Sequence, residues 1–342
     1  MNKDQSKQRD TSLDLVRIFG VALVVAGHSH FPWPLEKAIY SFHMPLFFFL
    51  SGMLFRDAPL APLARKKFNT LIVPYIIACL LTALLYWVAA GPAFGSGFFL
   101  SIPYGILWAH SPDSLYWNSP LWFLPALFWS FLGLTLFCRL AGARLGPPLS
   151  ALAGIALVGL AARHRELLPL GLDTATEGLV FVSLGMPFAQ VLAKLRPHPF
   201  RLAALAALSF AVWLAVFAAY PDYFVVAHLK VFPLWVWLLV SLSGTVAAVA
   251  AFTAACDLAS DRLTAGTRRW LAKAATYSFP LYMFHKPIIN LLAEGLQSRG
   301  YAPQSAYPLI FVLGVAITMA GILLLERCTP RLYALAVGGR VR

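Results

Sequence analysis

Residues 13–30 read LDLVRIFGVALVVAGHSH, an apolar run that nevertheless contains Asp14, Arg17 and His28. A helix needs about twenty apolar residues to cross roughly 30 Å of hydrocarbon, and this run has that length. Comparable apolar runs recur along the rest of the chain. The sequence therefore predicts a protein that crosses a membrane repeatedly.

The overall composition supports the same fold class. Of the 342 residues, 60% are hydrophobic and 12% are charged, about half the charged share of a soluble domain. The predicted fold is an all-α integral membrane protein, a polytopic bundle of about ten transmembrane helices. The expected spans lie near residues 13–30, 35–55, 68–90, 119–138, 149–162, 178–193, 202–219, 229–256, 268–291 and 305–326.

The excess of positive charge is explained by membrane topology. The chain has 27 Lys and Arg against 14 Asp and Glu, a net charge of +13. With the N-terminus inside, the inner segments hold 20 of the 27 cations, and Lys and Arg accumulate on the cytoplasmic side. We expect both termini to be cytoplasmic and expect no nucleic-acid partner. The predicted organisation is a cytoplasmic segment 1–12, one transmembrane domain 13–327 and a cytoplasmic tail 328–342.

The cysteines indicate neither disulfides nor a metal centre. All four lie alone in or beside apolar runs, and none has CxxC or Cys/His spacing. The first span has no small-residue cleavage site after it, so we expect it to be retained.

Ionisable residues in the first span are the leading candidates for a functional site, because such groups are costly in lipid. Arg17 and His28 are eleven residues apart, which returns them to nearly the same helix face about 16 Å apart along the axis. Asp14 precedes Arg17 by three residues and can pair with it. The alternative is an Asp14–Arg17 pair at the interface and a His28 that is a structural hydrogen-bonding residue.

The second predicted span carries a polar stripe. Glu36, Tyr40, His43 and Phe47 follow one another at helical spacing, and Ser51 comes next. We expect this stripe to face His28 across a tight turn. The alternatives are a structural role for His43, and a Ser-Gly pair at 51–52 that only allows two helices to approach closely.

Several motifs together resemble acyltransferase family 3, a family of integral membrane O-acyltransferases. They are the Arg17-x10-His28 spacing after Leu13-Asp14, FHMPLFFFLSGMLF at 42–55, NSPLWFLPALF at 118–128 and YSFPLYMFHKPI at 277–288. The last two are similar to the fucose O-acetylase-like branch. The resemblance implies a ten-span enzyme of the bacterial inner membrane. Such an enzyme transfers acyl groups, usually acetyl from acetyl-CoA, to hydroxyls of envelope glycans.

The chemistry of acyl transfer suits these residues. A base must remove the hydroxyl proton, and neutral imidazole titrates in the right range, so His28 is the candidate. Ser51, Trp122 or a second histidine can donate to the tetrahedral oxygen. Arg17 is expected to bind donor phosphate or to orient the catalytic group. Direct transfer and an acyl-histidine intermediate both remain open.

Other candidates lie further along the chain. His285 and Lys286 lie deep in the ninth span beside Pro280 and Pro287, and we place His285 in the site with His28, Asp14 and His43. Expected substrate-binding residues are Glu36, Ser51 and Trp122. The long outer loop 91–118 is rich in aromatic residues and carries Asp113, a combination that can bind a sugar. The alternative is that the loop forms an interfacial aromatic belt or a re-entrant loop.

Cations at 56–67 and 268–273 can meet the phosphates of coenzyme A, although the positive-inside bias predicts the same clusters. The expected partners are acetyl-CoA, an envelope glycan or lipid-linked saccharide, and membrane lipids, with no metal. The main alternative function is a transporter or flippase, since buried ionisable residues also suit a proton-coupled carrier. A non-catalytic partner of a polysaccharide synthase is a weaker third possibility.

Overall fold

The computed structural model describes residues 9–90, 97–109, 114–164, 168–220 and 233–339, and these form helices without any strand. The all-α prediction is confirmed for them. The helices are α1 (Thr11–Gly27), α2 (Trp33–Tyr40), α3 (His43–Met53), α4 (Leu60–Lys67), α5 (Val73–Ala90), α6 (Gly97–Trp108), α7 (Phe123–His164), α8 (Leu172–Leu195), α9 (Pro199–Ala219), α10 (Leu234–Leu258), α11 (Ala265–Gln297), α12 (Tyr307–Cys328) and α13 (Pro330–Ala336).

Six helical segments of the described chain are long and apolar enough to cross a membrane. They are Leu60–Ala89, Ser119–Ala161, Pro169–Leu195, Pro199–Ala219, Leu234–Leu258 and Pro303–Cys328. A multi-pass membrane protein is thus supported, while the number of about ten spans and the cytoplasmic termini stay predictions. Of the remaining helices, α1 has 17 residues and α3 has 11.

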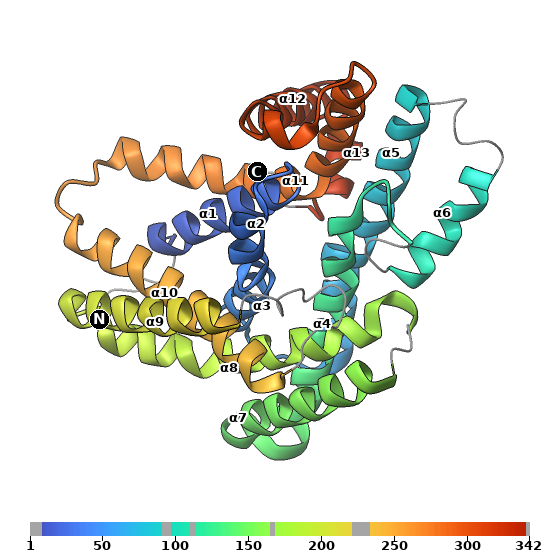
Figure 1. Ribbon diagram of the computed structural model, residues 1–342. Helices are drawn as coiled ribbons and strands as arrows, with labels where there is room; N and C mark the ends of the chain where they lie inside the picture. The colour runs from blue at the N-terminus through green and yellow to red at the C-terminus, as the bar shows by residue number, and fades with distance from the viewer. Residues whose placement is uncertain (1–8, 91–96, 110–113, 165–167, 221–232, 340–342) are drawn as a thin grey trace.

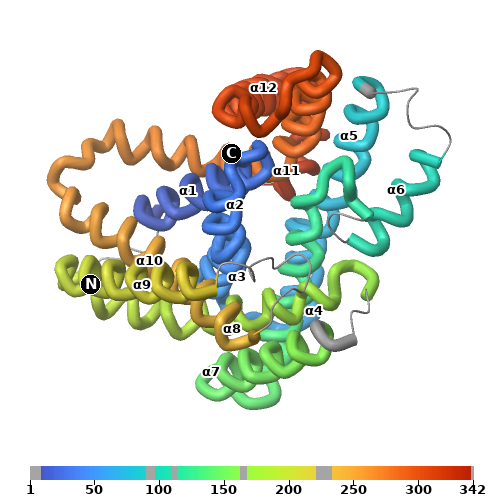
Figure 2. The backbone as a smooth tube through the Cα atoms, in the orientation of Figure 1, coloured from blue at the N-terminus to red at the C-terminus, as the bar shows by residue number. Residues whose placement is uncertain are grey.

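The N-terminal helices lie at the centre of the bundle. In Figure 1 and in the tube of Figure 2, α1, α2 and α3 occupy the middle of the view, between α9 and α10 on one side and α5 on the other. α1 contacts α3, α10, α11 and α12. Polar side chains on α1 are consequently surrounded by protein on several sides.

The predicted span 35–55 is two short helices and not one. α2 ends at Tyr40, and α3 begins at His43 after Phe42 takes a non-helical φ/ψ of −146° and −11°. Neighbouring helices satisfy the backbone at this break: Ser241 donates to the Ser41 carbonyl (2.8 Å), and Trp213 donates to the Ser41 hydroxyl (2.9 Å). A broken helix at membrane depth needs such partners, because lipid offers none.

The chain reverses inside α7. Gly142 has φ 78°, a left-handed conformation that favours glycine. A Cβ on Gly146 would lie 2.5 Å from the Cα of Cys138, whereas residues eight apart in a straight helix are about 12 Å apart. The segments before and after Gly142 therefore fold back on each other, in agreement with separate spans expected near 119–138 and 149–162.

Glycines bring α3 and α8 into backbone contact. A Cβ on Gly52 would overlap the carbonyl of Val182, and a Cβ on Gly185 would overlap the carbonyl of Phe49. Small residues allow helices in membranes to approach closely. The interpretation of Gly52 as a close-approach residue therefore fits the structure, and Ser51 beside it is left to face the interior.

We expect Gly52→Val to push α3 away from α8 and to destabilise the protein by about 1–3 kcal/mol, because the added carbons have no space. Thermal unfolding of the purified protein, followed by tryptophan fluorescence, measures the effect. Gly321→Val on α12 is the matched control, since nothing lies within 4 Å of a Cβ there. Equal unfolding temperatures for the two variants would contradict this packing.

Candidate functional site

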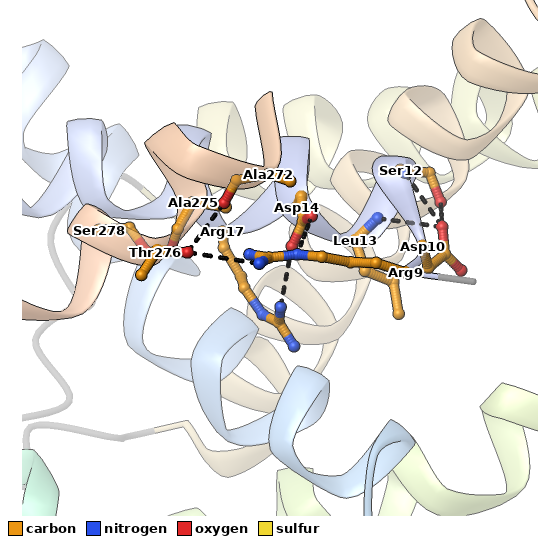
Figure 3. Close-up of polar contacts among 10 residues, drawn as sticks. All are labelled: Arg9, Asp10, Ser12, Leu13, Asp14, Arg17, Ala272, Ala275, Thr276 and Ser278. Atoms are coloured by element: carbon orange, nitrogen blue, oxygen red, sulfur yellow. Dashed lines mark hydrogen bonds and ion pairs between the residues drawn. The ribbon is translucent and has the colours of Figure 1, made fainter. Parts of the chain in front are cut away.

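A buried carboxylate near the start of α1 pairs with two arginines. Asp14 has 1% of its surface exposed. Its Oδ2 accepts from the Nε of Arg9 (2.5 Å), and its Oδ1 accepts from the Nη1 of Arg17 (3.0 Å). Arg9 also donates to the hydroxyl of Thr276 on α11 (3.3 Å), as Figure 3 shows. The expected Asp14–Arg17 pair is present, and Arg9 joins it.

The same end of α1 is tied to the end of α8. Asp10 caps α1 by accepting from the backbone N–H of Ser12 (3.0 Å), and it also accepts from the guanidinium of Arg196 (2.5 Å). Burial opposes ionisation of Asp10, but the hydrogen bonds from Arg196 and Ser12 outweigh it and lower the pKa of this carboxyl. The negative charge of Asp10 also interacts favourably with the positive, N-terminal end of the α1 helix dipole.

A cavity of about 490 Å³ opens beside this charged group. It lies between α1, α3, α7 and α11, and most of its wall is apolar. The polar residues that line it are Arg9, Arg17, Ser51, Thr276, Ser278 and Tyr282. An apolar chamber with a few convergent polar groups is the usual form of a small-molecule site.

Three of the predicted histidines gather beyond the other end of α1. The ring centroid of His28 lies 5.5 Å from that of His285 and 6.2 Å from that of Tyr40. Tyr40 lies 5.1 Å from His43 and donates to the Gly27 carbonyl (2.8 Å). Helices α1, α2, α3 and α11 thus bring together a histidine cluster, His28, His43 and His285 around Tyr40.

Backbone carbonyls determine which ring nitrogens carry the proton. Nδ1 of His285 lies 2.8 Å from the Tyr282 carbonyl, and Nδ1 of His43 lies 2.9 Å from the Ile39 carbonyl. A carbonyl only accepts, so each Nδ1 is the donor and each Nε2 of a neutral ring keeps its lone pair. Nε2 of His285 is buried without a hydrogen-bond partner among the described residues. Such a nitrogen can accept a proton.

Tyr282 connects the cavity to the histidine cluster. Its side chain lines the cavity, its carbonyl accepts from His285, and its hydroxyl donates to the Pro120 carbonyl (2.5 Å). None of the three histidines lines the cavity itself. The cavity therefore ends one helical turn from His285.

The predicted substrate-binding residues are divided between these regions. Ser51 lines the cavity. Glu36 is half-buried on α2, one turn before Tyr40 and beside the histidine cluster. Trp122 has 4% of its surface exposed, packs 6.3 Å from the ring of Phe48 and does not line the cavity.

The outer aromatic loop is used partly for packing. Phe98 and Trp117 are buried with ring centroids 6.1 Å apart, and Asn118 donates to the Met283 carbonyl (2.7 Å). Phe99 and Tyr104 in the same segment are more than half exposed, so a sugar site, an interfacial belt and a re-entrant loop all stay predictions for this loop. Asp113 lies outside the described residues.

Sequence reasoning missed Arg9, Thr276 and Tyr282. The position of Arg9, five residues before Asp14, is a usable signal for this pair. Thr276 and Tyr282 lie more than 250 residues from Asp14, so only folding reveals that they share its cavity. No group of metal-ligating side chains occurs in the part of the chain that the structure describes.

We expect Asp14→Ala to destabilise the protein by about 2–4 kcal/mol, because two partly buried arginines lose their counter-charge. Asp57→Ala is the matched control, since the Asp57–Arg139 pair is 3.7 Å long and nearly half exposed; its loss should cost under about 1 kcal/mol. Denaturant titration in mixed micelles measures both values. Equal losses would show that the Asp14 pair is no more important than a surface pair.

Comparison with known proteins assigns the chain to a family. A family model described as an acyltransferase domain, of acyltransferase family 3, matches residues 10–327. No curated protein and no solved structure matches the chain. The match covers α1 to α12, including the cavity and the histidine cluster. The chain therefore belongs to acyltransferase family 3 and is a multi-pass membrane acyltransferase.

Proposed function

We propose that this acyltransferase moves acetyl from acetyl-CoA to a hydroxyl of an envelope glycan, or of its lipid-linked precursor, in the bacterial inner membrane. The observation that carries the proposal is that Tyr282 lines the cavity containing Arg9 and Arg17 and also accepts a hydrogen bond from His285 of the histidine cluster. A thioester donor needs a chamber that excludes water, and a hydroxyl acceptor needs a base.

In the proposed reaction, Nε2 of His28 takes the proton of the acceptor hydroxyl. The hydroxyl oxygen attacks the thioester carbonyl, the carbon–sulfur bond breaks, and the thiolate leaves with that proton as coenzyme A. The ring of His285 lies 5.5 Å from that of His28, so its Nε2 lone pair is placed to accept a hydrogen bond from the protonated His28 ring. His43 lies on the other side of Tyr40, and the Nδ1 of both His43 and His285 is bonded to a backbone carbonyl. The same geometry permits an acyl-histidine intermediate.

The donor lies in the cavity in this proposal. Arg17 holds a donor oxygen at the inner end, and Asp14 keeps its guanidinium in place through the 3.0 Å ion pair. The Ser51 hydroxyl, also in the cavity wall, donates a hydrogen bond to an oxygen of the donor that occupies the cavity. Trp122 packs against Phe48 outside the cavity wall, so its substrate-binding role stays a prediction.

The acceptor approaches from the opposite end, where Glu36 is half-buried beside Tyr40. A carboxylate at this position can accept hydrogen bonds from sugar hydroxyls. The carrier alternative is not favoured, because the family match is to an acyltransferase.

We also propose ten spans with both termini cytoplasmic. Support comes from the directions of the helices: Ser130 donates to the Ala175 carbonyl (3.0 Å), while Ser150 and Ser183 are 2.7 Å apart. A Cβ on Gly133 would touch Leu179, so the first half of α7 runs parallel to α8; a Cβ on Gly154 would touch the Thr176 carbonyl, so the second half runs antiparallel, and the halves count as two spans. The α2–α3 pair counts as one more, and α1 and α11 complete the ten.

We expect cells without this gene to lose one acetyl mass per modified site on an envelope glycan. Mass spectrometry of extracted glycans measures the loss, and the mass difference identifies the acyl group. Wild-type protein should restore the modification, and His28→Ala should fail to restore it while folding and inserting normally.

The control for that variant is His30→Asn. His30 lies outside the histidine cluster, and its positive φ of 60° is a conformation that Asn tolerates. This variant should restore the modification fully. If His28→Ala restored the modification as fully as His30→Asn does, a role of His28 in the reaction would be contradicted.

We expect Arg17→Ala to raise the KM for acetyl-CoA by about ten- to a hundredfold, because a charged hydrogen bond to the donor contributes about 1.5–3 kcal/mol. Arg17→Lys should recover part of the affinity but not the paired geometry with Asp14. Steady-state kinetics of the purified protein measures both variants. An unchanged KM for Arg17→Ala would assign this arginine to structure alone.

A further inference from the structure

A second pocket lies between the end of α3 and α4. Its volume is about 420 Å³, and it is lined by Arg56, Asp57, Lys66 and Lys67 together with apolar residues. Leu54 lines both this pocket and the 490 Å³ cavity. We call it the inner pocket, and the shared Leu54 makes it adjacent to the cavity.

The lining of the inner pocket favours an anion. Three of its residues are cations, and the single acidic residue, Asp57, already pairs with Arg139 at 3.7 Å. Lys66 and Lys67 are consecutive residues of α4, which continues through a π-helical turn at Phe68–Ile72 into α5. The charges therefore gather at one place around a cavity instead of being spread over a surface.

Aromatic rings position one of these cations. The Nζ of Lys67 lies 3.4 Å from the ring centroid of Phe131, and the ring of Phe131 is stacked on Phe55 at 6.0 Å. Phe55 also lines the inner pocket. Cations beside an aromatic face are the combination that binds phosphate groups and a flat base together.

We propose that the inner pocket binds the phosphates of the nucleotide part of the acyl donor. The pantetheine part of the donor, which carries the acyl group and is called the arm below, passes Leu54 into the cavity. The role of the arm rests on the proposed acetyl transfer. Arg17 and Arg9 are poorer candidates for the phosphates, because they share the charge of Asp14. The inner pocket leaves these two arginines free to hold the arm.

The positive-inside bias explains cations on this side of the membrane but not their arrangement. Arg65 precedes Lys66 directly on α4 and is exposed, yet it does not line the inner pocket. The positive-inside bias depends only on charge and membrane side, which Arg65, Lys66 and Lys67 share. A phosphate site in the inner pocket instead depends on the two lysines that line it and not on Arg65. Arg65→Ala is therefore a control matched in charge, helix and membrane side.

The first experiment titrates adenosine 3′,5′-bisphosphate, a phosphate probe without the arm, into the full-length protein in nanodiscs. Wild type and Arg65→Ala should bind with affinities within about twofold of each other. Lys66→Ala/Lys67→Ala should bind at least about tenfold more weakly, since two charged hydrogen bonds are lost. Failure of wild type to bind the bisphosphate, or an equal loss in Arg65→Ala, would overturn the proposal.

The second experiment compares acetyl-CoA with S-acetylpantetheine, which has the arm but no nucleotide. In the double variant, the KM for acetyl-CoA should rise about tenfold with kcat unchanged, and the KM for S-acetylpantetheine should stay the same. Equal changes for both donors would overturn the proposal. If wild type transfers from neither donor, the proposed acetyl transfer fails, and the bisphosphate titration alone upholds or overturns the inner pocket.

Discussion

The ion pairs of Asp14 are the constraint on which the arrangement of the site depends. A carboxylate with 1% of its surface exposed needs cations, and Arg9 and Arg17 supply them. Arg9 extends the group to Thr276 on α11. The pairing fixes the beginning of α1 against α11, and the rigid helix then places His28 close to His285 on the same partner helix.

The two ends of α1 have different chemistry, and this difference suits an enzyme with two substrates. One end meets guanidinium groups and an apolar cavity, and the other meets a cluster of imidazoles, of which His43 and His285 bond to backbone carbonyls through Nδ1. Tyr282 belongs to both regions. Because cations suit a phosphorylated donor and imidazole suits a hydroxyl, the proposed substrates approach from opposite ends and meet near Tyr282.

Much of the fold and part of the site were predictable from local patterns. Apolar run length predicted the helical membrane class, and helical periodicity placed Asp14 and Arg17 on one face. The span predicted at 35–55 was wrong as one helix, because Ser241 and Trp213, far away in the chain, satisfy the backbone and side chain of Ser41 at the break. Apolar content cannot reveal such a break, because it does not record the non-helical backbone that Phe42 adopts between the two helices.

What the sequence by itself determined is the class of protein, the positions of most helices and the polar residues that lipid does not tolerate alone. These properties depend on local composition and spacing, which are visible in one chain. Only the tertiary structure decided that Arg9 joins Asp14, that Tyr282 connects the cavity to His285, and that Lys66 and Lys67, but not Arg65, line the inner pocket. Those relations depend on packing that no local pattern records: Arg9 reaches Thr276 on α11, and the cavity that Tyr282 lines lies between α1, α3, α7 and α11.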